Sequence, residues 1–219
     1  MITPSISIED YLGAIFRLLP QDGQPLPLGD LQEYFGFSPI SIHEMIQKLV
    51  HRGLVNYFPY KGVTLTPDGQ VTASALVRRH RIWEAFLANE LNVPIDEVHH
   101  LAGDLEHAAP DWITERLYTH LGQPESCPHG SVIDESEIHQ PGMCLNEAEV
   151  GQIFMISRIS PESETSLQLA RKMGLLPGEK VKILRKTDTN IEIDINQQIT
   201  ALSIEESSSF WGMDITDGS

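Results

Sequence analysis

Histidine and glutamate side chains recur at helical spacing in the middle third of this chain of 219 residues. His80 and Glu84 are four positions apart, so on a helix their side chains lie one above the other on the same face. His99, Glu106 and His107 form a second group, in which the first two residues are two helical turns apart. Imidazole and carboxylate groups at such spacings can bind a divalent cation. These five residues therefore make a metal site a candidate function.

The charge of the chain is concentrated in the same region. The chain has 15 Lys and Arg residues against 31 Asp and Glu residues, a formal net charge of −16. Residues 65–140 carry 13 of those acidic residues and most of the histidines. Such a field attracts cations and repels nucleic acid, which suits a divalent-cation site. A solvated acidic surface is the alternative, and the absence of a His-Glu-x-x-His motif gives no support for a zinc protease.

Composition excludes several classes of protein. The hydrophobic content of 41% is that of a globular chain, and no apolar run approaches the ~20 residues of a bilayer-spanning helix. Cys127 and Cys144 are the only cysteines, which excludes a disulfide scaffold. The N-terminal residues do not resemble a signal peptide. We expect a cytoplasmic protein with no membrane association.

Residues 1–65 show the order helix, helix–turn–helix, β-hairpin. Ser7 is a cap for a first helix, residues 28–35 form a second, and Ser38-Pro39 begins a third that runs to Arg52. Residues 54–58 and 63–65 predict two strands joined by a turn. This order is typical of a winged helix–turn–helix domain that binds DNA, although such domains also dock proteins. Candidate DNA contacts are the polar positions of the third helix and the tip of the wing: Ser38, Pro39, Ser41, His43, Glu44, Gln47, Lys48 and Lys61.

Residues 66–140 predict three helices followed by a linker. Thr66-Pro67 begins a helix that runs to about residue 91, Pro94 begins the next, and Asp111 caps the third. Apolar residues on more than one face suit a dimer interface or a monomer core. Residues 123–142 lack periodicity and predict a linker, in which Cys127 and His129 are interpreted as part of a turn. His100 and His120 are expected at the surface.

Residues 141–219 change to short apolar strands around 150–156, 180–184, 191–195 and 199–202. A short helix is predicted at 167–173, before a Gly-Leu-Leu-Pro-Gly turn. Short strands with tight turns indicate a small β-barrel. The fold class is therefore mainly α with a β-rich C-terminal domain.

The order of these features resembles the diphtheria-toxin-repressor family of metal-activated transcriptional repressors, across essentially the whole chain. The resemblance rests on the winged domain, His80…Glu84…His99…Glu106-His107, the segment Cys127-Pro-His-Gly, and residues 173–178 within the barrel. It implies a helical dimerisation domain over 66–140 and a barrel of Src-homology-three type over 141–219. The implied partners are operator DNA and a second copy of the chain.

The resemblance also implies two metal sites. Asp10, Glu106 and His107 match the primary site, and His80, Glu84 and His99 match the ancillary site. The chain departs from the family at Gly103, where a cysteine or glutamate ligand is usual. Glu162, Glu164 and Gln168 are candidate ligands from the barrel, and the sequence does not choose among them.

The mechanism that the resemblance implies is a cation that ties the winged domain to the dimerisation domain. That tie would set the spacing of two recognition helices near one turn of DNA, ~34 Å. The implied cofactor is Mn²⁺ or Fe²⁺, with Mn²⁺ favoured by hard ligands, while Zn²⁺, Co²⁺ or Ni²⁺ can bind in vitro. A protein-docking winged module and a metal-binding hydrolase remain as alternatives.

Overall fold

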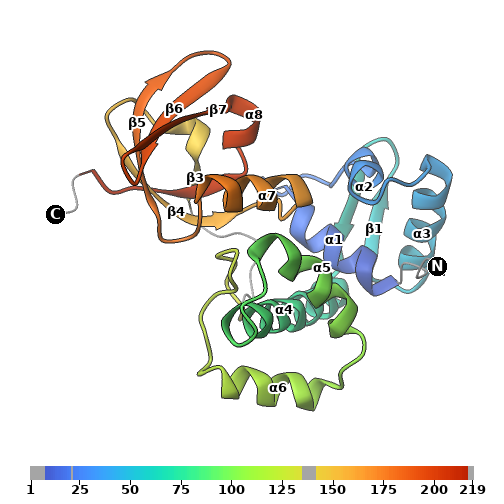
Figure 1. The fold of residues 1–219 in the computed structure, drawn as a ribbon. Helices are drawn as coiled ribbons and strands as arrows, with labels where there is room; N and C mark the ends of the chain where they lie inside the picture. Colours follow the sequence, from blue (N-terminus) through green and yellow to red (C-terminus); the bar gives the residue numbers. More distant parts are fainter. Residues whose placement is uncertain (1–7, 21, 135–141, 217–219) are drawn as a thin grey trace. The chain divides into compact units, whose positions relative to one another are not determined.

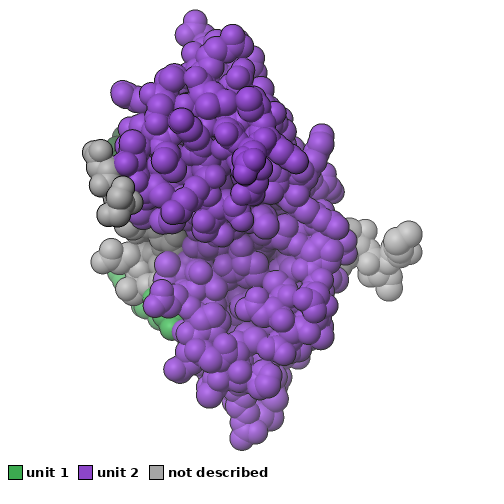
Figure 2. Space-filling view, turned by 60° about the vertical axis from the view of Figure 1, so that its left-hand side comes forward, with its two compact units in different colours: residues 1–79, 134–139 green, residues 80–133, 140–219 purple. Residues whose placement is uncertain are grey.

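A computed structural model describes residues 8–20, 22–134 and 142–216. The chain divides into two compact units, one of residues 1–79 with 134–139 and one of residues 80–133 with 140–219 (Figure 2). The predicted cap Ser7 and part of the predicted linker, residues 135–141, lie outside the described residues.

The first unit is built from three helices and a hairpin (Figure 1). Helix α1 spans Ile8–Leu18, α2 spans Leu28–Phe35 and α3 spans Pro39–His51. Strands β1 (Val55–Phe58) and β2 (Gly62–Leu65) pair antiparallel, and α4 (Pro67–Asn89) follows. Ser38 caps α3 through its hydroxyl, which accepts a hydrogen bond from the Ser41 amide. The predicted helix–turn–helix and hairpin are thus confirmed.

Apolar stripes of these helices form one core. Its fully buried members include Tyr11, Leu12, Ile15, Leu31, Ile42, Ile46, Leu49, Val55 and Val63. The base of the wing is fixed to this core, because Leu26 and Val63 exchange backbone hydrogen bonds of 2.8 and 2.9 Å. Gly62 is required there: its φ is 133°, and a Cβ would lie 2.0 Å from the Leu26 carbonyl oxygen.

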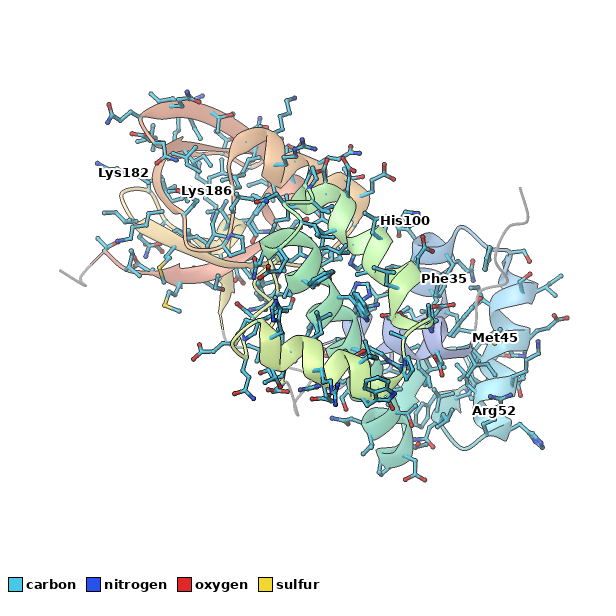
Figure 3. All side chains as sticks on the ribbon, turned by 60° about the horizontal axis from the view of Figure 1, so that its bottom comes forward. Phe35, Met45, Arg52, His100, Lys182 and Lys186 are labelled. Atoms are coloured by element: carbon cyan, nitrogen blue, oxygen red, sulfur yellow. The ribbon has the colours of Figure 1, made fainter. Side chains whose placement is uncertain are left out.

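The second unit contains the remainder of α4, the later helices of the chain and a sheet. Helix α5 spans Ile95–Glu106 and α6 spans Asp111–His120. His100, expected at the surface, is exposed on α5 (Figure 3). The guanidinium of Arg171 donates hydrogen bonds to Asp96, which links α7 (Glu164–Met173) to α5. Contacts of α5 with α7 thus attach the β-rich part to the helices within this unit.

The sheet has six antiparallel strands in the order β3-β8-β4-β5-β6-β7. Their bounds are β3 Met143–Cys144, β4 Ile153–Ile159, β5 Lys180–Lys186, β6 Asn190–Ile195, β7 Gln198–Ser203 and β8 Phe210–Asp214. A 3-10 helix (Leu145–Glu147) and α8 (Ile204–Ser207) complete the domain. Alternate residues, among them Phe154, Ile156, Ile191 and Ile193, are fully buried in its core.

The expected fold class is confirmed: helical domains precede a small antiparallel β domain. Four strands coincide with predicted ones, whereas β3 and β8 were not predicted. Among the described residues, no helix combines the length and apolar character needed to cross a bilayer.

Candidate metal centre and DNA-binding surface

Four segments of the second unit bring six potential ligands together. Helix α4 supplies His80 and Glu84, α5 supplies His99, the turn after α6 supplies Cys127 and His129, and the residue before the α7 cap is Glu162. We call these six residues the Glu84 cluster. They form two groups of four, His80, Glu84, His99 and Glu162, and Glu84, Cys127, His129 and Glu162. Within each group the potential ligand atoms all lie within 4.8 Å of one another.

Glu84 lies at the centre of this cluster and is fully buried. Its Oε1 is 2.9 Å from His80 Nε2, 2.9 Å from His99 Nδ1 and 3.2 Å from His129 Nδ1. Its Oε2 is also buried and has no hydrogen-bond partner among the described residues. A buried carboxylate oxygen without a partner is costly, and a cation bound there would remove that cost.

Hydrogen bonds outside the cluster orient its ligands. The other ring nitrogen of His129, Nε2, donates to the Ile95 carbonyl at 2.9 Å, which leaves Nδ1 directed at Glu84. His80 Nδ1 lies 2.8 Å from Glu106 Oε2, and Ser131 donates to Glu162 Oε1 at 2.7 Å. Metal-binding histidines and carboxylates are typically held by such second hydrogen bonds. The cluster therefore has both the ligand types and the support of a metal site.

The segment of Cys127 and His129 is a turn, as interpreted from the sequence, but it is not solvent-exposed. The segment folds back on itself, with Ser126 and Val132 forming an antiparallel bridge. Cys127 and His129 are buried, and the Ile159 amide of β4 donates to the His129 carbonyl at 2.9 Å. Gly130 allows this close approach, since a Cβ would lie 1.9 Å from the Ser157 carbonyl oxygen. The turn is thus packed against the sheet.

Of the three barrel candidates, only Glu162 joins the cluster, with Oε2 3.4 Å from His99 Nδ1. The side chain of Gln168 instead donates to Glu164 at the exposed surface of α7. The sequence did not choose among the three because the approach of α7 to α5 depends on contacts distant in the chain.

Burial and mutual contact shift the pKa values in the cluster. Burial opposes ionisation of Glu84, but the neighbouring His129 and His80 outweigh it and hold its pKa well below the usual range. Burial also disfavours charged His99 and His129, yet their glutamate partners raise both pKa values. Burial, with the Glu84 charge, raises the pKa of Cys127 to about 12. Because metal ligation requires deprotonated imidazoles, we expect a bound cation to displace protons from His99 and His129.

The remaining predicted ligands are not members of the Glu84 cluster. Glu106 ends α5 and is 8% exposed, and its Oε1 lies 3.2 Å from the His107 Nε2. Asp10 lies in α1 of the first unit and is half-buried. Gly103 lies on α5 one turn before Glu106, and a Cβ added there would meet nothing within 4 Å.

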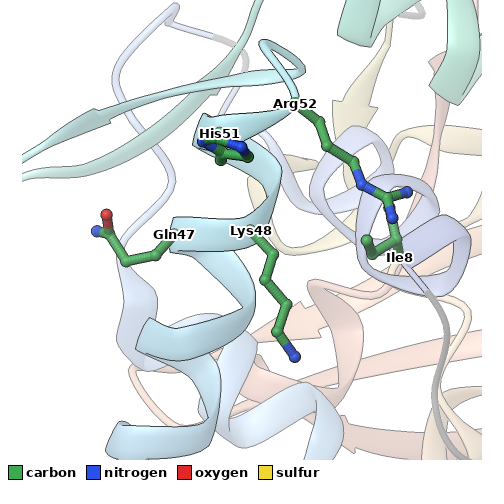
Figure 4. Close-up of a pocket in the computed structure, with 5 residues that line it drawn as sticks. All are labelled: Ile8, Gln47, Lys48, His51 and Arg52. Carbon is green, nitrogen blue, oxygen red and sulfur yellow. The ribbon is translucent and has the colours of Figure 1, made fainter.

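The predicted DNA contacts form an exposed surface of the first unit. All eight side chains are exposed: Ser38, Pro39, Ser41, His43, Glu44, Gln47, Lys48 and Lys61. Beside them, the end of α3 and the start of α1 border an open groove of about 410 Å³, lined by Ile8, Gln47, Lys48, His51 and Arg52 (Figure 4). Arg52 was not among the predicted contacts; it is the C-cap residue that follows the last residue of α3, His51.

Known families and proteins match this chain along most of its length. Residues 4–63 match the iron dependent repressor N-terminal DNA binding domain, and residues 66–135 match the iron dependent repressor metal binding and dimerisation domain. Residues 143–210 match the FeoA domain. An uncharacterized HTH-type transcriptional regulator of Methanocaldococcus jannaschii is 35% identical over 113 residues, which are 52% of this chain and 90% of that protein. The chain belongs to the iron-dependent, or diphtheria-toxin, repressor family.

Two further relatives match this chain over most of its length. The diphtheria toxin repressor of Corynebacterium glutamicum is 29% identical over 190 residues, covering 86% of this chain and 75% of that protein. A solved manganese-dependent transcriptional repressor in complex with manganese is 30% identical, with a TM-score of 0.85, covering 95% of this chain and 100% of the other. The family consists of metal-dependent transcriptional repressors, and its metal-binding domain coincides here with α4, α5 and the turn that carry most of the Glu84 cluster.

Proposed function

We propose that this protein represses transcription by binding operator DNA as a homodimer when it is loaded with Mn²⁺ or Fe²⁺, and that it thereby controls genes of metal-ion homeostasis. The observation that carries the proposal is the Glu84 carboxylate: three imidazoles surround one oxygen, and the other has no hydrogen-bond partner within the described parts of the chain. A buried carboxylate with these contacts is better explained by a bound structural or regulatory cation than by a protein core that binds no metal.

The primary metal ligands of the proposal are Asp10, Glu106 and His107, which match the family's first site residue by residue. An ion held by Asp10 and by the end of α5 would join the DNA-binding unit to the helices that carry the family's dimerisation region. Without that ion, ordering the two units for DNA binding would cost free energy, which weakens binding.

The choice of metal follows from the ligands. Oxygen and nitrogen donors at Glu84, His80 and His99 favour Mn²⁺ or Fe²⁺, whereas the thiol of Cys127 adds a softer donor. We therefore expect the cluster to bind Zn²⁺ or Co²⁺ in vitro as well.

The proposed DNA surface combines α3 with the wing. Lys48 and Arg52 provide positive charge in a chain that is otherwise strongly acidic, so they are suited to contacts with phosphate groups. At the tip of the wing, Tyr60 is fully exposed with a φ of 65°, next to Lys61. Side chains other than glycine and asparagine are rare at this φ, so we assign Tyr60 to the DNA surface as well.

A gel-shift titration at one stated salt concentration tests the proposal. Metal-stripped protein should bind a palindromic operator weakly, and Mn²⁺ or Fe²⁺ should tighten binding. His107→Ala should abolish this response while circular dichroism and the melting temperature show an intact fold. The proposal fails if the wild type binds DNA equally with and without metal. Metal-dependent binding by His107→Ala would refute the ligand assignment.

A further inference from the structure

We propose that the outer face of the C-terminal sheet binds the same face of a second copy of this chain, through a row of four side chains that is complementary to itself. The row consists of Ile153, Lys182, Asp194 and Ile199. This inference goes beyond the proposed function. The family's dimerisation region matches residues 66–135, outside the sheet, so the contact would be additional to the homodimer proposed above.

The strand register aligns the row across four neighbouring strands. Lys182 of β5 lies directly opposite Ile153 of β4 on one side and Asp194 of β6 on the other. Asp194 in turn lies opposite Ile199 of β7. Residues directly opposite each other project from the same face of a sheet. The row faces outward, because the chain neighbours of its members in β4, β5 and β6 are buried in the core: Phe154, Val181, Ile183, Ile193 and Ile195.

Apolar side chains are exposed at both ends of this row. Ile153 is 36% exposed and Ile199 is 67% exposed. Beside Ile153 on the same face, the half-buried Met155 lies opposite Met213, which is 48% exposed. The solvated face of an antiparallel sheet normally carries polar residues. Exposed apolar side chains grouped on one face indicate an interaction surface.

The two charged members of the row make no ion pair within the parts of the chain that the structure describes. Lys182 is exposed (Figure 3), although a carboxylate lies on the neighbouring strand. Asp194 is half-buried, and its Oδ1 is buried without a hydrogen-bond partner among the described residues. A carboxylate oxygen that is screened from water is stabilised by a charged donor. An ammonium group from a partner surface would supply that donor.

A two-fold axis makes the row complementary to itself. In a symmetric contact of this kind, residue i contacts residue j and j contacts i. If the axis lies in the interface, parallel to the strands and between β5 and β6, Lys182 faces the partner's Asp194. The same axis places Ile153 over the partner's Ile199. Every contact occurs twice, so two ion pairs are enclosed by two apolar contacts, and the sheets pack face to face as in other β proteins.

The charges along both central strands agree with this axis. The outer face of β5 carries Lys180, Lys182 and Arg185, whereas that of β6 carries Glu192 and Asp194. The axis places the basic strand of each copy over the acidic strand of the other. A nucleic acid would be attracted by β5 and repelled by β6, so the face fits a second copy better than it fits a polyanion.

Sedimentation equilibrium of the full chain without metal or DNA tests the contact. The mass of the wild-type assembly should double as its concentration rises, and high salt should weaken this step. Lys182→Asp and Asp194→Lys should each weaken it by roughly tenfold or more, because one reversal places like charges together at both symmetric contacts. An equimolar mixture of the two variants should regain the step, since each variant supplies the charge that the other has lost.

Lys172→Asp is the matched control, because it makes the same charge reversal at an exposed position of α7, away from the sheet, and it should behave as the wild type. Three results would each overturn the inference: a wild type whose mass does not double, a doubling that both single variants retain, or a mixture that associates no better than either variant alone. The readout involves neither metal nor operator DNA, so its outcome is independent of the tests of the proposed function.

Discussion

Replacing Glu84 by glutamine tests the central feature of the metal centre with almost no change in shape. Glu84 Oε1 lies 2.9, 2.9 and 3.2 Å from three imidazole nitrogens. Hydrogen bonds to a charged acceptor stabilise by about 1 kcal/mol more than those to a neutral one, so the three contacts together lose about 3 kcal/mol. Part of this is recovered, because a neutral amide is less costly to bury than a carboxylate.

We therefore expect a net loss of roughly 2 kcal/mol in the free energy of unfolding of the metal-free protein. For a chain of this size, that loss lowers the melting temperature by roughly 4–8 °C. Mn²⁺ at 100 times its dissociation constant raises the free energy of unfolding by about 2.7 kcal/mol for each site that binds the ion only in the folded protein. Glu84→Gln should lose the part of this gain that comes from the Glu84 cluster.

Differential scanning calorimetry with and without Mn²⁺ measures both effects. Glu164→Gln is the matched control: it makes the same chemical change at an exposed glutamate that bonds only Gln168 among the described contacts, and it should behave as the wild type. If Glu84→Gln keeps the melting temperature of the wild type and its full increase with Mn²⁺, the argument from the buried carboxylate is wrong.

Three further predictions follow from other residues. Gly103→Glu should raise Mn²⁺ affinity in titration calorimetry, because a Cβ there meets no neighbour within 4 Å and the new carboxylate lies one turn before Glu106. The control Gly103→Ala should only stabilise the helix, by about 1 kcal/mol. Equal Mn²⁺ affinities of the two variants would contradict the prediction. Metal binding should release protons, and metal affinity should increase as the pH rises through the raised pKa values of His99 and His129. Calorimetry in buffers of different ionisation enthalpy measures the number of protons released. Metal affinity that does not change between pH 5 and pH 8 would count against the site. Tyr60→Asn should stabilise the wing by about 1 kcal/mol, since asparagine tolerates a positive φ. The same substitution should weaken operator binding in the gel shift. An unchanged affinity for the operator would exclude Tyr60 from the DNA surface.

Local signals predicted the elements well wherever the cause is local. The Ser38 hydroxyl and the proline after it begin α3, and Gly36, with a φ of 67°, ends α2, because caps involve neighbouring residues only. Strand β8 was not predicted: Gly212 interrupts its apolar residues, and its place in the sheet depends on β4, about fifty residues away. That glycine is required by packing, since a Cβ would lie 2.0 Å from the Met155 carbonyl oxygen.

The sequence alone determined the helical spacing that places His80 above Glu84, the resemblance to a repressor family, and the residue types available to a cation. It could not determine that Cys127, His129 and Glu162 meet Glu84, because that convergence arises from the packing of a turn on β4 and of α7 on α5. The physical reason is that spacing along a helix is set by local backbone geometry, whereas a metal site is completed by side chains that only the tertiary fold brings within a few ångströms of one another.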